Sequence, residues 1–216
     1  MAGQHRNPER SRERIVDAAL AEFADHGYAG ARVQSIAQRA GLNKQLISHH
    51  FGGKRALYDA VMSERRLRGG GELLGPASPV ADALPTFFDA ARADPEWLRV
   101  LVWESLEAED DDDGVAGAEA RRSRYLDRVD WVAAEQAAGR LPAGLDPALL
   151  LLTLFGAALY PLLLPAVCEM LTGSAPDSDD FAARYREHLH QLASSLSRDS
   201  LNRDSLNRDS LSRGAG

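Results

Sequence analysis

The strongest chemical signal in this 216-residue chain is a group of hydrogen-bond donors in the short segment 44–51. On a helix, one arc of roughly 140° would hold four polar side chains: Lys44, Gln45, Ser48 and His49. Such side chains suit phosphate oxygens and the base edges of the DNA major groove. The segment therefore predicts a helix with one donor-rich side that faces a polar partner.

The same residue types do not form a catalytic arrangement. Ser48 and His49 are adjacent on the expected helix and point apart, so they cannot act as a nucleophile and its base. His188 and His190 are two residues apart and cannot share a metal ion from one helix. We therefore expect no enzymatic activity, no catalytic residue, no metal and no cofactor.

A preceding helix is expected to position the donor-rich segment. One helical face in 33–40 carries apolar residues at the spacing i, i+3, i+4 and i+7: Val33, Ile36, Ala37 and Ala40. Gly41 suits a left-handed helix end, and the Asn43 side chain suits an N-cap. Ile47 and Phe51 of the second helix can then pack on the first, which predicts a helix-turn-helix.

Charge is distributed unevenly along the chain. The net charge is −7, but residues 1–68 hold 12 Lys/Arg against 7 Asp/Glu, and the remainder is acidic. A basic first third on an acidic remainder is expected of a nucleic-acid-binding head joined to a separate body. Cys168 is the single cysteine and the N-terminus lacks an apolar signal region, so we expect a cytoplasmic protein.

Two further helices should flank the helix-turn-helix. Ile15, Ala19 and Phe23 recur every four residues in a helix that ends near Gly27. Its start is basic, which fits either a solvated helix end or phosphate contact by Arg6, Arg10, Arg12 and Arg14. After Gly52-Gly53, Lys54 opens a helix with Leu57, Val61 and Met62 inward, a suitable clamp for the DNA backbone.

Residues 12–62 resemble the DNA-binding domain of the TetR family of bacterial transcriptional regulators. The matching features, in order, are F-x-x-x-G-Y, V-x-x-I-A-x-x-A-G, the H-F that closes the third helix, and K-x-A-L. The resemblance implies an all-α chain with a three-helix helix-turn-helix head and a helical body that binds an effector and dimerises.

The chain departs from the family pattern at two places. Ala31-Arg32 replaces the usual capping Thr or Ser before the second helix, and Ser48-His49 replace the usual aromatic residues. Arg32 can hold a phosphate but is no cap. The predicted DNA-binding residues are Arg32, Gln34, Lys44, Gln45, Leu46, Ser48, His49 and Lys54.

The remainder predicts a helical body after a Gly/Pro-rich linker at 69–81. Helices are expected at 80–93, 95–108 and 118–138, and the acidic run 109–114 fails the register of a calcium loop. Aromatic side chains there suit either core packing or an effector pocket, for which the candidates are Phe87, Trp103, Tyr125, Trp131, Phe155 and Tyr160.

Segment 147–168 contains no charge, which allows either a membrane span or a fully buried helix. We favour the buried helix, with no membrane partner, since Pro161 and Pro165 interrupt helix bonding. The resemblance implies a dimer interface here and at 178–196, with candidates Leu152, Leu159, Tyr185, Leu189 and Leu192. The five-residue repeat at 198–212 forms no apolar stripe, so we expect a disordered tail.

The expected domains are 8–68 (DNA binding), 76–197 (effector binding and dimerisation) and 198–216 (tail). The sequence favours a ligand-responsive repressor that binds a near-palindromic operator in double-stranded DNA as a homodimer and answers to an unknown small-molecule effector. The alternatives are a helical interaction protein with a vestigial helix-turn-helix, or a membrane-associated regulator that uses 147–168.

Overall fold

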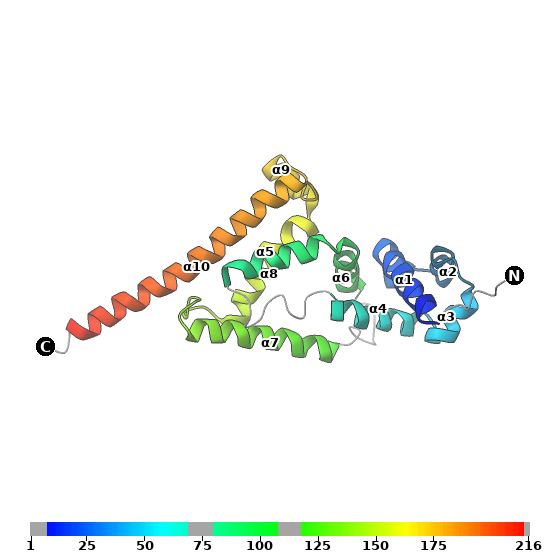
Figure 1. The fold of residues 1–216 in the computed structure, drawn as a ribbon, viewed down its shortest axis with the longest axis horizontal. Coiled ribbons are helices and arrows are strands. Elements are labelled where there is room, and N and C mark those ends of the chain that lie inside the picture. The colour runs from blue at the N-terminus through cyan, green and yellow to red at the C-terminus, as the bar shows by residue number, and fades with distance from the viewer. Residues whose placement is uncertain (1–7, 69–79, 108–117, 214–216) are drawn as a thin grey trace. The chain divides into compact units, whose positions relative to one another are not determined.

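All regular elements in the described part of the chain are α-helices (Figure 1). The computed structural model describes residues 8–68, 80–107 and 118–213, with side chains for 8–64, 81–107 and 122–197. The ten helices in these ranges are α1 Pro8–Gly30, α2 Val33–Ala40, α3 Lys44–Phe51, α4 Lys54–Arg68, α5 Val80–Arg92, α6 Pro95–Glu107, α7 Ala118–Ala137, α8 Pro147–Leu163, α9 Pro165–Thr172 and α10 Asp179–Arg213. The predicted all-α class is confirmed.

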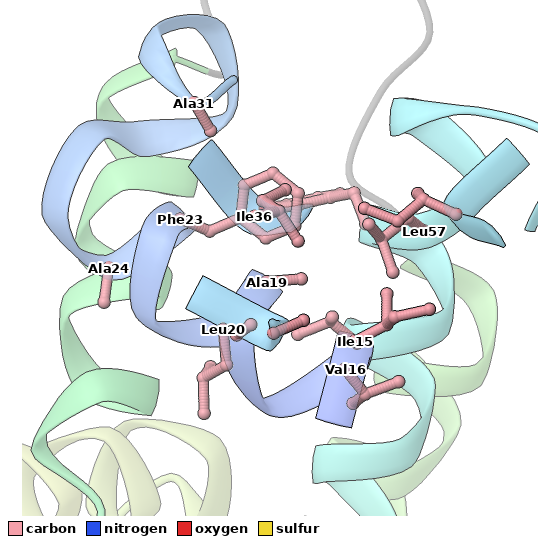
Figure 2. Packing of buried hydrophobic residues seen from close by; sticks show 14 of the residues in the cluster. Ile15, Val16, Ala19, Leu20, Phe23, Ala24, Ala31, Ile36 and Leu57 are labelled. Carbon is pink, nitrogen blue, oxygen red and sulfur yellow. The ribbon is translucent and has the colours of Figure 1, made fainter. Parts of the chain in front are cut away.

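One compact unit contains α1 to α4 together with α6. Ile15 and Phe23 of α1, Ile36 of α2, Ile47 of α3 and Leu57 of α4 are completely buried in its core. Figure 2 shows side chains of α1, α2 and α4 directed into this common interior. Burial of each large apolar side chain stabilises the fold by about 1.5–3 kcal/mol, which is how such short helices persist.

Helix α6 belongs to this first unit, although its residues follow α5 in sequence. Val100 is buried in the core of the unit, and Trp97 and Leu101 pack against the same cluster. The domain expected at 76–197 included the residues of α6. Apolar spacing identified α6 as a helix, but it does not reveal which neighbour the apolar face will cover.

The second unit contains α5, most of α7, and α8 to α10. Its apolar core includes Phe88, Val132, Leu154 and Leu189. Ion pairs join α5 to α10 at several levels: Asp89 accepts from Arg186 at 2.7 Å, and Arg92 lies 2.8 Å from Asp179. Because the later residue of α5 pairs with the earlier residue of α10, the two helices run antiparallel.

The uncharged segment 147–168 is not one helix. Helix α8 ends at Leu163, α9 begins at Pro165, and the two axes are bent by 90°. Within the described residues no single helix is long and apolar enough to span a bilayer, whereas the bent pair α8–α9 passes that test by length and composition only. Pro165 explains the break, because it cannot donate a backbone hydrogen bond and suits the first position of a new helix.

Helix α10 continues to Arg213, so the tail is helical in the structure where the sequence led us to expect disorder. Extending an existing helix costs much less than starting one, and the 179–197 portion supplies the start. The arm residue Arg6, most of the expected linker (69–79) and the acidic run 109–114 lie outside the described residues.

Candidate nucleic-acid interface

The turn between α2 and α3 has the predicted geometry. Gly41 is left-handed (φ 60°, ψ 37°), its N–H donates to Gln38 O at 3.0 Å, and the N–H of Leu42 donates to Ala37 O at 3.0 Å. This pair of bonds closes the end of α2 and requires a residue that tolerates positive φ. Asn43 Oδ1 then accepts from the N–H of Gln45 at 2.9 Å and caps α3, as predicted.

The capped helix α3 exposes the predicted donor arc. Lys44, Gln45, Ser48 and His49 are all exposed, Leu46 is half-buried, and Ile47 is completely buried. On α2 and the residue before it, Gln34 and Arg32 are exposed as well. Seven of the eight predicted contact residues therefore lie on α2, on α3 or directly before α2. The eighth, Lys54, is the first residue of α4.

Arg32 precedes α2 but provides no side-chain cap, as expected from its residue type. A carboxylate from α1 instead holds the connection before α2: Glu22 Oε1 accepts from the backbone N–H of Arg32 at 3.3 Å. Glu22 Oε2 lies 3.1 Å from Arg39 Nε of α2, and the Glu22 side chain is only 4% exposed. The hydrogen bond that Arg39 donates to Asp25, followed by the charges of Asp25 and Glu22, raises the pKa of Arg39 against the opposite effect of burial.

Glu22 was not among the predicted residues, because ten positions separate it from Arg32 and no local pattern links them. It anchors both ends of α2 to α1, through the N–H of Arg32 and the side chain of Arg39, and leaves α2 without a side-chain cap. A surface cleft of about 400 Å³ adjoins this network and is lined in part by Arg32, Ser35, Gln38 and Arg39.

Two of the four basic residues at the start of α1 are engaged within the fold. Arg14 Nη2 donates to the carbonyl of Ala40 at the end of α2. Arg12 pairs with Glu64 of α4, and its guanidinium lies 5.2 Å from the centre of the Phe51 ring. These two side chains thus help to hold α2, α3 and α4 on α1, and because a guanidinium has five donors, phosphate contact by them stays a prediction.

Lys54 begins α4 and has a partner inside the protein. Its Nζ donates to the carbonyl of Ala29 at 3.1 Å and lies 4.7 Å from the centre of the Tyr28 ring. Burial lowers the pKa of Lys54, and the charge of Glu107 opposes that shift. An ammonium has three donors, so phosphate contact by Lys54 stays a prediction.

Comparison with known sequences places this geometry in a family. Residues 15–61 match the sequence model described as bacterial regulatory proteins, tetR family, and residues 84–194 match the one described as tetracyclin repressor-like, C-terminal domain. The chain belongs to the TetR family. It is 33% identical over 178 residues to the HTH-type transcriptional repressor SCO4008 of Streptomyces coelicolor, which covers 81% of this chain and 90% of that relative.

Two further proteins that resemble this chain are a transcriptional repressor and a solved transcriptional regulator. The HTH-type transcriptional repressor NicS of Pseudomonas putida is 27% identical over 127 residues, 55% of each chain. The solved structure of SCO4942 from Streptomyces coelicolor is 27% identical, covers 85% of this chain and 96% of that chain, and has a TM-score of 0.69. The TetR-family protein described here is a DNA-binding transcriptional regulator, as the sequence predicted.

The predicted effector-pocket residues do not all meet. Phe87 of α5 stacks on Phe155 of α8, with ring centres 4.9 Å apart, and Tyr125 of α7 lies 6.2 Å from Phe155. The Arg128 guanidinium lies 5.7 Å from the centre of the Phe155 ring, and burial lowers the pKa of Arg128. The structure thus brings together three of the six candidates, from α5, α7 and α8, beside a partly buried cation.

The other three candidates lie elsewhere. Trp103 is in the first unit, where its indole N–H donates to the carbonyl of Ala24 at 3.2 Å. Trp131 lines a void of about 10 Å³ with Leu84, Leu141 and Leu154, and its buried indole nitrogen has no hydrogen-bond partner among the described residues. Tyr160 is 46% exposed. Periodicity could not separate these environments, because all three side chains occur at helical spacing.

The predicted dimer residues divide into surface and core. Leu152 is 67% exposed and Leu159 is half-buried on α8. Leu189 is completely buried, and the Tyr185 hydroxyl donates to the carbonyl of Ala157 at 2.5 Å. Leu189 therefore packs in the core of its own chain, which corrects its assignment to the dimer surface. Tyr185 is half-buried and Leu192 is 36% exposed, so their place in an interface stays a prediction.

A stripe of exposed apolar side chains runs along α8. Its exposed members are Leu149 at 65%, Leu152 at 67%, Tyr160 at 46% and Leu163 at 40%. Of its exposed members, only Leu152 was among the predicted dimer residues. Because α8 is apolar on every side, the sequence could not show which stripe faces outward. The spacing of three, eight and three residues keeps the four side chains on one side of the helix.

Proposed function

We propose that this protein is an effector-responsive repressor that acts in the cytoplasm and binds a near-palindromic operator as a homodimer. The observation that carries the proposal is the donor arc of α3, which is exposed on a helix fixed by Asn43, Gly41 and the buried Ile47. A helix presented in this way fits the major groove, where Lys and Gln side chains can read base edges.

The exposed stripe on α8, together with Leu159, supports the homodimer. Contiguous apolar surface of this kind marks an interface, and a second copy of α8 offers a self-complementary partner. Two α3 helices then read half-sites about 34 Å apart on one side of the duplex. Pairing is necessary because a single eight-residue helix contacts too few bases to select one operator.

The cluster of Phe87, Tyr125 and Phe155 supports the effector site, since aromatic side chains from three helices line many ligand pockets. Arg128 beside these rings would favour an effector that carries an acidic group. Binding that favours one arrangement of the body would lower operator affinity by the difference in effector affinity between the arrangements.

The decisive test is selection of bound fragments from genomic DNA of the source organism, followed by anisotropy titrations of the recovered duplex at several salt concentrations. We expect an inverted repeat with half-sites one helical turn or a multiple of it apart, a dimer by light scattering, and affinity that falls steeply with salt. A monomer with no preference among duplexes at moderate salt would overturn the proposal.

A further inference from the structure

Helix α1 is broken at Gly27, a few residues before α2 begins. Gly27 adopts φ 69° and ψ 178°, outside the helical region, and a short turn of Tyr28 to Gly30 follows. The N–H of Ala31 closes this turn on Gly27 O at 3.2 Å. The first N–H groups of any new helical turn lack acceptors in the chain that precedes them, so Tyr28 and Ala29 need an acceptor from elsewhere.

Helix α6 provides that acceptor. Glu107 Oε2 accepts from the N–H of Tyr28 at 2.9 Å, and Oε1 accepts from the N–H of Ala29 at 3.1 Å. One helical turn earlier, Trp103 Nε1 donates to Ala24 O at 3.2 Å, on the other side of the break. Two side chains of α6 thus satisfy donors and an acceptor that the break exposes.

The backbone around Gly27 leaves room for this carboxylate. A Cβ atom on Gly27 would lie 2.4 Å from Glu107 Oε1 and 3.0 Å from Trp103 Cε3. The positive φ and the close approach both favour glycine at this position. Because Gly27 has no side chain, Glu107 and Trp103 of α6 can reach the backbone at the end of α1.

The short turn is also held from α4. Lys54 Nζ donates to Ala29 O, the carbonyl of the same residue whose N–H is bound by Glu107. Lys54 is the first residue of α4 and follows the end of α3 by three positions, and Val33 follows Gly30 by three positions. The turn of Tyr28 to Gly30 therefore leads into α2 and is hydrogen-bonded, through Lys54, to the start of the helix that follows α3.

We infer that Glu107 is a positioning residue for DNA binding: from α6 it fixes the turn that connects both ends of the helix-turn-helix. It does so without belonging to the DNA-contacting surface. This inference rests on the DNA-binding function of α3. Its consequence is that operator affinity depends on a carboxylate 56 residues beyond the end of α3.

The test compares Glu107→Gln with wild type on the operator duplex recovered by the genomic selection. The amide offers one acceptor where the carboxylate offers two, and its NH2 group would face a backbone N–H. Glu96→Gln is the matched control, because it removes the same charge from the first turn of the same helix. Circular dichroism at the assay temperature measures the folded fraction of each protein.

We expect Glu107→Gln to bind the operator roughly ten-fold more weakly than wild type while it remains folded, and Glu96→Gln to stay within about two-fold. NMR titration of Lys54 separates the loss of this charge from a general loss of packing, which would expose Lys54 and raise its pKa. Its pKa should fall in Glu107→Gln, where the neighbouring charge is removed, and stay constant in Glu96→Gln.

Operator affinity within two-fold of wild type in folded Glu107→Gln would overturn the inference, as would a loss of affinity that only follows the unfolded fraction. If Glu107→Gln does not fold, Trp103→Phe replaces it, because it keeps the ring and removes the donor to Ala24. A several-fold loss supports the inference and an unchanged affinity overturns it. Failure of wild type to select any duplex would instead count against the proposed function.

Discussion

Glu135, near the end of α7, accepts two hydrogen bonds from the guanidinium of Arg140, at 2.6 and 2.7 Å. Its backbone carbonyl accepts from the N–H groups of Arg140 and Leu141, so this residue pair closes the end of the helix. The hydrogen bonds from Arg140 lower the pKa of Glu135, against the opposite effect of its burial.

A lowered folded-state pKa gives the stability of this helix end a defined pH dependence. The contribution is fully present above the unfolded pKa near 4.5 and is lost as pH falls through the lower folded-state value. We expect Glu135→Gln to reduce the free energy of unfolding at pH 7, with the difference from wild type shrinking toward pH 3. Urea denaturation across this range measures it, with exposed Glu187→Gln as the control, and equal pH profiles for the two variants would contradict the assignment.

Glu22 should be the most sensitive polar position of the DNA-binding unit. Its buried carboxylate accepts from the N–H of Arg32 and pairs with Arg39, so Glu22→Gln weakens a charged hydrogen bond and removes the buried one of the two carboxylates that pair with Arg39. We expect a loss of about 1.5–3 kcal/mol in the free energy of unfolding. Asp25→Asn is the control, because Asp25 pairs with the same arginine at a 39% exposed site and should cost less than about 1 kcal/mol. Equal losses would show that burial of Glu22 is not the source of its effect.

Local sequence rules predicted the helix-turn-helix to the residue. The bounds of α2 and α3 follow from Gly41, Asn43 and the apolar spacing, which act within a few positions of the chain. Contacts between distant side chains could not be predicted in this way. Glu22 of α1 accepts from the N–H of Arg32 before α2, and Glu107 of α6 accepts from two N–H groups at the end of α1. Each is a single acidic residue in a helix, and nothing nearby in sequence marks its role as an acceptor.

Uniformly apolar segments limited the prediction for a different reason. The spacing in 147–168 carries no polar side, so the outward stripe of α8 could not be located. Pro165 indicated an interruption of helix bonding, but not the 90° bend between α8 and α9. For α10, the predicted dimer residue Leu189 proved to be completely buried in the core of its own chain. The Tyr185 hydroxyl donates to the carbonyl of Ala157 on α8, although Tyr185 is only half-buried. An apolar stripe indicates which side of a helix is buried, but not whether the same chain or a partner chain covers that side.

Arg32→Ser separates a stabilising role at the start of α2 from a DNA contact. Arg32 has the extended conformation of an N-cap (φ −119°, ψ 127°) without a capping side chain, and Ser can supply one. We expect the melting temperature to rise, through a gain of about 0.5–1 kcal/mol, while affinity falls by a similar factor for all duplex sequences. A fall in both stability and base preference would show that Arg32 reads bases and that Glu22 already satisfies the helix start.

Two leucines that the sequence grouped together should behave differently on substitution. Leu152→Glu places a charge in the exposed stripe of α8, so we expect dimer dissociation by light scattering with little change in monomer stability. Leu189→Ala removes a completely buried side chain and should cost about 2–5 kcal/mol without a direct effect on association. Dissociation caused by Leu189→Ala at conditions where the protein stays folded, with Leu152→Glu still dimeric, would place the interface on α10 instead.

Gln45 is the side chain of α3 for which we expect the largest effect on base preference. It lies in the first turn of α3, is exposed beside Lys44, and can bond an adenine edge through both the oxygen and the nitrogen of its amide group. We expect Gln45→Ala to lower affinity for the selected operator by about 1–3 kcal/mol and to leave affinity for a duplex altered at one base pair per half-site nearly unchanged. Titration of single-base-pair variants of the operator identifies that base pair, and Gln191→Ala, an exposed glutamine on α10, serves as the control. A uniform loss across all duplexes would instead mean that Gln45 contacts the phosphate backbone, and the source of base preference would then have to be sought among Lys44, Ser48 and His49.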